Sequence, residues 1–147
     1  MAPIDVSAEI DIAASPADVA GVMFDPQREP EWMKAVKGVE LIDPALEPGA
    51  RVRRTGSFLG RDFAWTTEVE AVHFPHVLAL KIVDGPFLGT VRYDIQRAGG
   101  GSRVRVRNLG EPGALGLLPD ALIAGPMRSA LTGDLQRLKA LVEQSGT

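Results

Sequence analysis

The chain has 147 residues, contains no cysteine and carries a formal net charge of −3 at neutral pH. This length suits one domain, and the lack of cysteine excludes disulfides, thiolate metal sites and cysteine nucleophiles. The acidic balance disfavours sequence-independent nucleic-acid binding, which relies on an excess of basic charge. We therefore expect a single domain over residues 1–147, with no nucleic acid as a partner.

The sequence also lacks the signals that direct a protein into or across a membrane. No stretch of about 18 apolar residues is present, so we expect no integral membrane segment. The N-terminal residues alternate polar and apolar side chains and carry Asp5, Glu9 and Asp11, unlike a signal peptide. Because cysteine is absent as well, we expect a cytoplasmic protein.

The first predicted element is a strand over Asp5–Ile12, where apolar and polar residues alternate with period two. A short helix should follow, because Ser15 is a good N-cap and Pro16 suits the first helical position. A second short helix is predicted over Arg28–Ala35. The buried face of the first helix would carry Val19, Val22 and Met23.

Six further strands are predicted after these helices, each bounded by Gly, Pro or Asp turn signals. Because the strands follow one another with short links, they should pair antiparallel. The predicted ranges are Val39–Ile42, Ala50–Phe58, Asp62–Val72, Val77–Val83, Thr90–Arg97 and Ser102–Asn108.

The C-terminal part has apolar residues at helical spacing from Leu115 to Val142, which predicts one long amphipathic helix. Gly125-Pro126 interrupts this pattern, and an interior proline predicts a kink or break. We hypothesise that Gly113–Ala124 opens for ligand entry while Leu131–Val142 stays packed. The alternative is that Pro126 only bends the helix to follow the sheet.

The N-terminal pattern resembles that of the START-like, or SRPBCC, superfamily of polyketide cyclases/dehydrases and lipid-transport proteins. The residues that carry the resemblance are the run Ile10–Val19, then Val22, Phe24-Asp25 and Pro30-Glu31-Trp32. The resemblance implies an α+β helix-grip fold. In this fold a curved antiparallel sheet of about seven strands wraps around a long C-terminal helix, and two short helices follow the first strand. It also implies a cavity for a hydrophobic or aromatic small molecule.

The hairpin around Leu59-Gly60 fixes which side chains would face that cavity. A two-residue loop pairs Phe58 with Arg61 and places Arg54 opposite Trp65, on an otherwise apolar face. A buried arginine needs a carboxylate, water or an anionic ligand as partner. We hypothesise that Arg54 orients a carboxylate or phenolate of the ligand; the alternative is an arginine that reaches out to solvent.

Further candidates follow from the same alternation. Tyr93 and Asn108 fall on inward phases, and Tyr93 would contact either the ligand or a structural partner. Trp32 would either line the cavity or only pack the short helices. We expect a cavity of several hundred Å³. The predicted ligand-binding residues are Trp32, Arg54, Phe58, Trp65, Thr67, Tyr93, Val106, Asn108, Met127 and Leu131.

Other polar residues are interpreted as structural. Arg103, Arg105 and Arg107 share the outer face of one strand and should pair with Asp94 and other acids across the sheet. His73 and His76 bracket a turn and lack a third ligand at metal-binding spacing, so no metal is expected. The inward set contains no His, Asp or Glu.

Three functions remain open at this stage. The first is a non-catalytic carrier or sensor that binds a lipid, polyketide, quinone or terpenoid and needs no cofactor. The second is a polyketide cyclase/aromatase or dehydratase that uses polar cavity residues, although no catalytic residue can be named. The third is a protein-interaction module of the chaperone-activator type, which would need an exposed apolar patch. The sequence leaves open whether the protein is a monomer or a homodimer.

Overall fold

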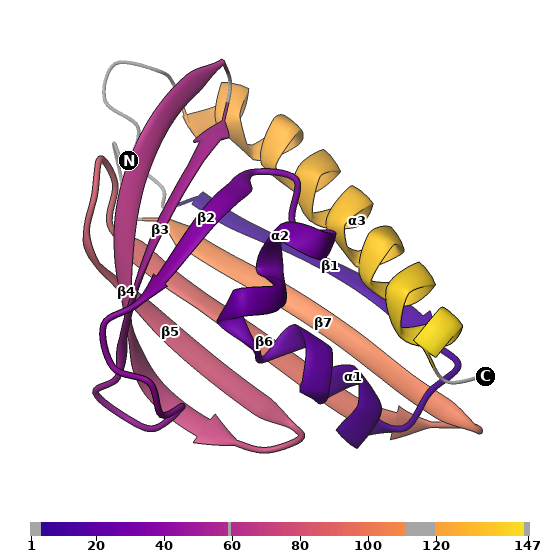
Figure 1. Cartoon of the computed structure of the whole chain (residues 1–147). Helices are drawn as coiled ribbons and strands as arrows, with labels where there is room; N and C mark the ends of the chain where they lie inside the picture. Colours follow the sequence, from indigo (N-terminus) through magenta and orange to yellow (C-terminus); the bar gives the residue numbers. More distant parts are fainter. Residues whose placement is uncertain (1–3, 59, 111–119, 146–147) are drawn as a thin grey trace.

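The computed structural model describes residues 4–58, 60–110 and 120–145. A curved antiparallel sheet of seven strands wraps around a long C-terminal helix, and short helical segments lie at one end of the sheet (Figure 1). The predicted α+β helix-grip fold is confirmed.

The strands alternate buried and exposed side chains, as expected for a sheet with one covered face. The strands are β1 (Ile4–Ile12), β2 (Val36–Leu41), β3 (Arg51–Phe58), β4 (Arg61–His73), β5 (Val77–Asp84), β6 (Gly89–Ala98) and β7 (Gly101–Gly110). The helical segments are α1 (Pro16–Met23), the 3-10 turn η1 (Pro26–Arg28), α2 (Glu29–Trp32) and α3 (Asp120–Ser145).

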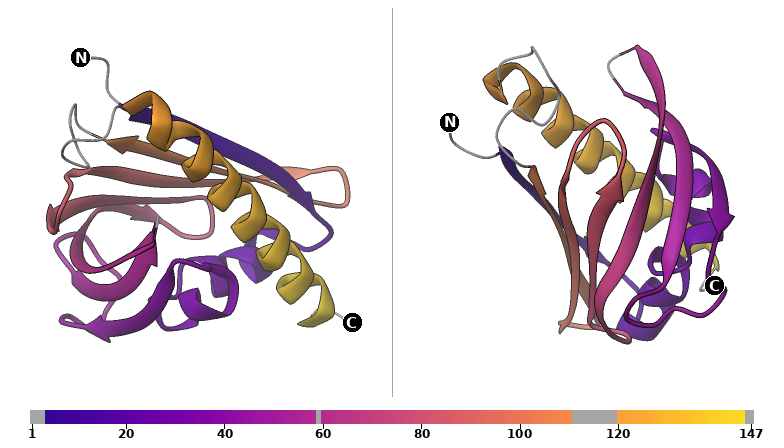
Figure 2. Two further views of the ribbon diagram at one scale, coloured as in Figure 1. Left: turned by 90° about the horizontal axis from the view of Figure 1, so that it is seen from above. Right: turned by 90° about the vertical axis from the view of Figure 1, so that its left-hand side faces the viewer.

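The spatial order of the sheet is β1-β7-β6-β5-β4-β3-β2, so β1 and β2 form its two edges. α3 runs along β1 at one edge (Figure 2, left). At the other edge, the register of β2 against β3 shifts between Val36 and Gly38. β2 also exposes Lys37 and Glu40 there.

The β3–β4 hairpin has the predicted register. Phe58 pairs with Arg61, and Arg54 pairs with Trp65. Because side chains alternate along a strand, this register turns Arg54, Trp65 and Thr67 toward α3. The position of Arg54 on the covered face is therefore confirmed.

α1 forms where the sequence predicts it. The Ser15 hydroxyl oxygen accepts a hydrogen bond from the backbone N–H of Asp18 at 3.2 Å, as an N-cap does. Val19, Val22 and Met23 are buried, as predicted.

The predicted helix over Arg28–Ala35 is wrong in length. α2 is a single turn that ends at Trp32, and Met33 is extended, with φ −96° and ψ 109°. The backbone N–H of Lys34 then donates to the Asp134 carboxylate at 3.1 Å, and this contact turns the chain into β2. β2 consequently begins at Val36, three residues before the predicted start.

α3 runs without a break through Pro126, so of the predicted kink or break the break is wrong, while the kink stays a prediction. Proline removes one backbone hydrogen bond, from its own position to the carbonyl of Leu122. Leu122 is 64% exposed, so the lost hydrogen bond falls on the solvent side of the helix, where such a loss costs least. The proposed entry segment, Gly113–Ala124, falls largely outside the described residues. Its opening therefore stays a prediction.

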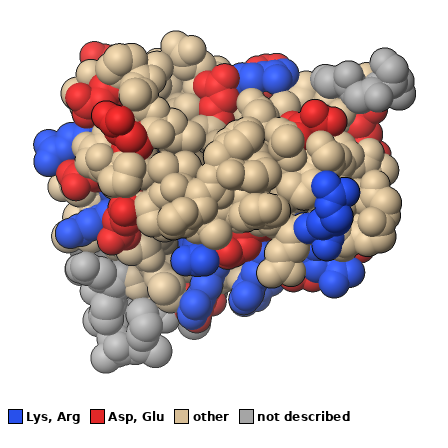
Figure 3. Space-filling model, turned by 90° about the horizontal axis from the view of Figure 1, so that it is seen from below, with Lys and Arg blue, Asp and Glu red and all other residues tan. Residues whose placement is uncertain are grey.

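The outer face of the sheet is a mixed-charge surface. Arg107 pairs with Asp5 at 2.7 Å and Arg103 with Asp11 at 3.0 Å, both across the β1–β7 pair. Asp94 lies opposite Arg105 in the β6–β7 register, but its ion pair, at 3.0 Å, is with Arg92 of its own strand, so its predicted pairing across the sheet is wrong. In the view from below, Figure 3 shows acidic and basic side chains of both signs around a largely uncharged middle. No described helix is long and apolar enough to span a membrane.

Candidate functional site

The space between the sheet and α3 contains two adjoining chambers. The inner chamber has a volume of about 60 Å³ and lies beside α2. Its walls combine apolar side chains with several polar ones. They are formed by Glu29, Trp32, Met33, Arg54, Trp65, Thr67, Leu80, Val91, Tyr93, Val106, Asn108, Leu131, Asp134 and Leu135.

The outer chamber has a volume of about 160 Å³ and is largely apolar. Large apolar side chains from the β3–β4 hairpin, the β5–β6 connection and α3 line it. Its walls include Phe58, Phe63, Phe87, Leu88, Met127 and Ala130. Six residues line both chambers: Met33, Trp65, Val91, Asn108, Leu131 and Asp134.

All ten predicted ligand-binding residues lie on the walls of these chambers, although ligand contact itself stays a prediction. The residues of the inner chamber alone are Trp32, Arg54, Thr67, Tyr93 and Val106. Those of the outer chamber alone are Phe58 and Met127. Those shared by both are Trp65, Asn108 and Leu131.

The prediction of one cavity of several hundred Å³ is wrong: the two chambers have volumes of about 60 and 160 Å³, and aromatic side chains occupy the space next to the inner chamber. Trp32 packs edge-on against Tyr93, with ring centroids 6.2 Å apart. Phe24 stacks against the same tyrosine at 6.3 Å. Trp32 is only 2% exposed, so it both packs α2 against the sheet and lines the inner chamber.

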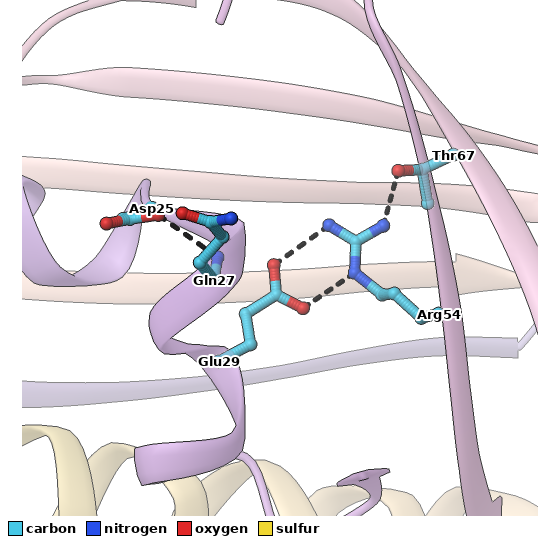
Figure 4. A network of polar contacts seen from close by, with 5 residues as sticks. All are labelled: Asp25, Gln27, Glu29, Arg54 and Thr67. Atoms are coloured by element: carbon cyan, nitrogen blue, oxygen red, sulfur yellow. Dashed lines mark hydrogen bonds and ion pairs between the residues drawn. The ribbon is translucent and has the colours of Figure 1, made fainter. Parts of the chain in front are cut away.

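A buried ion pair forms one wall of the inner chamber (Figure 4). The Arg54 Nε and Nη2 groups donate to the two carboxylate oxygens of Glu29 at 2.6 and 2.8 Å. Arg54 Nη1 donates to the Thr67 hydroxyl oxygen at 2.5 Å. Arg54 is 4% exposed and Glu29 is 3% exposed, so neither charge is solvated.

Short local contacts place Glu29 at this point. The Asp25 carboxylate accepts from the backbone N–H of Gln27 at 3.0 Å and caps η1, which leads directly into α2. Burial opposes the charge on Arg54, but the hydrogen bonds and attraction from Glu29 prevail and raise the pKa of Arg54 above its ordinary value. The guanidinium therefore stays charged and its charge is neutralised within the chain.

The Glu29–Arg54 pair bears on the two alternatives given above for Arg54, a ligand anchor or an arginine that reaches solvent. The alternative in which Arg54 reaches solvent is wrong, because strand β3 directs the side chain under α2. The partner that a buried arginine requires is a carboxylate of the chain itself. The expectation that no acid faces inward is also wrong, since Glu29 does. A four-residue helix has no periodicity from which its inward face could be read.

Asp134 is a second inward acid that the sequence reasoning missed. Its carboxylate accepts from the Lys34 backbone N–H and from Arg137, while Arg137 Nε donates to the Trp32 carbonyl at 3.0 Å. These contacts tie α3 to the end of α2. Burial raises the pKa of Asp134, and the Lys34 and Arg137 hydrogen bonds oppose that effect without cancelling it. Asp134 follows Leu131 by three positions, so helical spacing alone would have placed it on the leucine face.

Two buried polar atoms near these groups have no hydrogen-bond partner among the described residues. They are Trp32 Nε1 and Asn108 Oδ1. Both residues line the inner chamber. Burial also raises the pKa of Tyr93, so its hydroxyl stays protonated.

Within residues 4–58, 60–110 and 120–145, no group of three or more His, Cys, Asp or Glu side chains converges as a metal site does. His76 Nδ1 lies 2.8 Å from the Ile95 carbonyl oxygen, a structural contact between the β4–β5 turn and β6.

A sheet that grips one helix around an internal, mostly apolar space defines a START-like, helix-grip protein. The family model described as polyketide cyclase / dehydrase and lipid transport matches residues 3–143. The chain therefore belongs to this family, within the SRPBCC superfamily. Family and fold together indicate a hydrophobic-ligand-binding member.

Solved structures show the same fold at low sequence identity. The protein TTHA0849 from Thermus thermophilus is 22% identical, with a TM-score of 0.81 over 97% of this chain and 99% of that one. A START superfamily protein from Mycobacterium smegmatis is 18% identical, with a TM-score of 0.82 over 95% and 97%. DR_A0006 from Deinococcus radiodurans is 20% identical, with a TM-score of 0.72 over 96% and 98%. No curated protein sequence matches the chain.

Proposed function

We propose that this protein is a non-catalytic carrier or sensor that binds a hydrophobic or aromatic small molecule of the lipid, polyketide, quinone or terpenoid type. The observation that carries the proposal is the outer chamber. Aromatic and aliphatic side chains, among them Phe58, Phe63, Phe87 and Met127, surround about 160 Å³ of space there. Apolar chambers of this kind bind ligands by removing apolar surface from water.

The volume of the outer chamber sets the scale of the bound group. An engineered apolar cavity of about 150 Å³ holds a benzene ring. The outer chamber is therefore large enough for one ring or a short branched chain without any rearrangement. The rest of a larger ligand would extend past the chamber rim.

The electrostatics of the walls favour an uncharged ligand. The charges of Glu29 and Arg54 neutralise each other, and Asp134 is paired with Arg137. A carboxylate entering the inner chamber would meet an arginine whose charge is already compensated. It would also lose its hydration, which is costly.

The test combines ligand identification with a chamber-filling variant. Native mass spectrometry of the freshly purified protein should show a co-purified apolar molecule. Ala130 of α3 lines the outer chamber, so Ala130→Phe should fill the space and weaken binding of an apolar fluorescent probe at least tenfold. Ser129→Phe is the matched control, because Ser129 is the exposed neighbour on the same helix. Equal binding by both variants and the wild type would contradict the proposal.

A second function, a cyclase or dehydratase, is favoured by one observation. Asp134 lines both chambers, and its raised pKa is a property of general acids. If the protein were such an enzyme, Asp134→Asn should abolish turnover of a polyketide-type substrate while probe binding persists. Loss of neither turnover nor binding would exclude this role for Asp134.

A further inference from the structure

A surface groove of about 290 Å³ lies between α1, the β2–β3 loop (42–50) and the β4–β5 turn, at the lower end of the molecule in Figure 1. It shares no wall residue with the inner or the outer chamber. Phe24 on the groove wall stacks against Tyr93 on the wall of the inner chamber, with ring centroids 6.3 Å apart. The groove is therefore a second space, and the proposed function makes no use of it.

Most of the groove wall is apolar, and solvent reaches part of it. Val52 and Val69 on the wall are buried, whereas Leu46 is 36% exposed and Phe74 is 58% exposed. Large exposed apolar side chains gathered at a concave surface are typical of a binding site. An apolar cavity of about 150 Å³ holds a benzene ring, so the groove has room for one ring with a short chain.

Both charged residues on the groove wall are acidic. Asp25 and Asp43 line it, and no described lysine or arginine does. One carboxylate oxygen of Asp25 accepts from the backbone N–H of Gln27 at 3.0 Å. One carboxylate oxygen of Asp43 accepts from the backbone N–H of Arg51 at 2.9 Å. Neither carboxylate forms an ion pair within the described part of the chain, so neither negative charge has a paired base.

The two arginines whose backbone N–H groups bond to these aspartates have counter-charges of their own. The Arg28 side chain pairs with Glu31 at 2.9 Å, and the pKa of Arg28 is raised mainly by Glu31, with a smaller contribution from Asp25. The Arg51 side chain pairs with Glu68 at 3.1 Å. Because an aspartate side chain is short, both carboxylates lie within the screening distance of the groove, about 8 Å at physiological salt. The groove is therefore a locally negative surface.

We propose that this groove is a binding site for a small apolar amine in its ammonium form. The apolar body of the amine packs against Leu46, Phe74 and the buried valines, and the ammonium group lies near the carboxylates of Asp25 and Asp43. The site is independent of the two chambers, so its failure would leave the proposed function standing.

The chemistry of the wall selects a cation over other head groups. Carboxylates attract an ammonium group, and the face of an aromatic ring such as the exposed Phe74 attracts it as well. An anion would meet two like charges. A neutral molecule would gain only the burial of its apolar body. An amine is therefore the head group that this wall binds most tightly.

The experiment compares three probes with the same propylphenyl body: 4-propylbenzylamine, 4-propylbenzyl alcohol and 4-propylbenzoate. Binding is followed by nitrogen-15 NMR at neutral pH. The backbone N–H signals of Gly21 and Ala45 report the groove. The indole signals of Trp32 and Trp65 report the chambers, whose walls these residues line. From the groove signals, the amine should bind about 3–10-fold more tightly than the alcohol, on the scale of two partly exposed charge pairs. The benzoate should bind most weakly, and the advantage of the amine should shrink at high salt.

The double variant Asp25→Asn/Asp43→Asn removes the two charges and keeps an acceptor for each backbone hydrogen bond. The amine should then bind no more tightly than the alcohol. The matched control Asp18→Asn/Asp62→Asn removes two charges from exposed residues outside the groove wall and should leave most of the preference intact.

Gly21→Leu gives a second test that does not depend on charge. Gly21 lies on α1 at the groove wall, and a β-carbon added there meets no other atom within 4 Å. Leucine also forms helices better than glycine, so this variant should fold. It should weaken binding of both the amine and the alcohol at the groove severalfold. Ala17→Leu, at an exposed position one turn earlier on the same helix, is its control and should leave both affinities unchanged.

The site of the signal changes and the order of affinities decide between the outcomes. Equal groove affinity for the amine and the alcohol, or tightest binding of the benzoate, would overturn the proposal. Equal loss of the preference in both double variants would also overturn it, by assigning the preference to the net charge of the protein. An amine that shifts only the indole signals would bind in the chambers and not in the groove. That result, or unchanged affinity in Gly21→Leu, would overturn the groove as a site.

Discussion

The buried ion pair between Glu29 and Arg54 gives a sharp energetic prediction. Glu29→Gln preserves the shape of the side chain but leaves the Arg54 charge without a counter-charge. Both residues are under 5% exposed, and both carboxylate oxygens are within 2.8 Å of a guanidinium nitrogen. Removal of one partner of such a pair destabilises a protein by about 3–5 kcal/mol.

This loss is large relative to the stability of an ordinary domain, about 5–15 kcal/mol. For a chain of about this length, each kcal/mol lowers the unfolding temperature by about 2–4 °C, so Glu29→Gln should lower it by about 6–20 °C. Urea unfolding followed by circular dichroism measures the free energy directly. The double variant Glu29→Leu/Arg54→Met should recover most of the loss, because no buried charge remains.

The neighbouring pair Arg28–Glu31 provides the matched control. Its atoms lie 2.9 Å apart, but both side chains are solvent-accessible. Exposed pairs contribute little, so Glu31→Gln should leave the urea midpoint nearly unchanged. If Glu29→Gln behaved like Glu31→Gln, water would have to reach Arg54, and the reasoning about the buried pair would be refuted.

Two further predictions concern pH. Tyr93 is the only tyrosine, and burial raises its pKa above the ordinary 10, so the ultraviolet signal of tyrosinate should appear only as the protein unfolds. Stability should therefore fall as pH rises past 10, and titration of the native protein at 10 would contradict this. Burial also raises the pKa of Asp134 above 3.8, so the native state holds this proton more tightly than the unfolded state. In urea unfolding between about pH 4 and 7, the stability of the wild type relative to Asp134→Asn should fall as pH rises, and a rise would contradict the assignment.

The parts of the fold that depend on short-range patterns could be predicted from the sequence. Period-two alternation and the two-residue loop at Leu59-Gly60 determine the β3–β4 register, and with it the face on which Arg54 and Trp65 lie. The cap at Ser15 likewise needs only neighbours in the chain. Each of these features depends on a few consecutive residues.

The missed features depend on contacts between residues far apart in the sequence. Lys34 meets Asp134 across 100 positions, and Arg137 meets the Trp32 carbonyl across 105. No periodicity encodes such pairs, so the end of α2 and the start of β2 could not be placed. The cavity volume was overestimated for a related reason. The volume of a cavity is the small difference between the volume that the backbone encloses and the volume of the side chains that fill it, so it depends on the packing of residues far apart in the sequence.

The two edges of the sheet also determine how copies of this protein behave at high concentration. Fibre growth and edge-to-edge dimerisation both need an open, regular strand that can accept another strand. α3 runs along β1 at one edge. At the other, an incoming strand would have to match the irregular register at Val36 and Gly38 and lie against the charges of Lys37 and Glu40. Continuation of the sheet from one molecule into the next is therefore disfavoured at both ends, and assembly of this protein would have to use its helices or the outer face of its sheet.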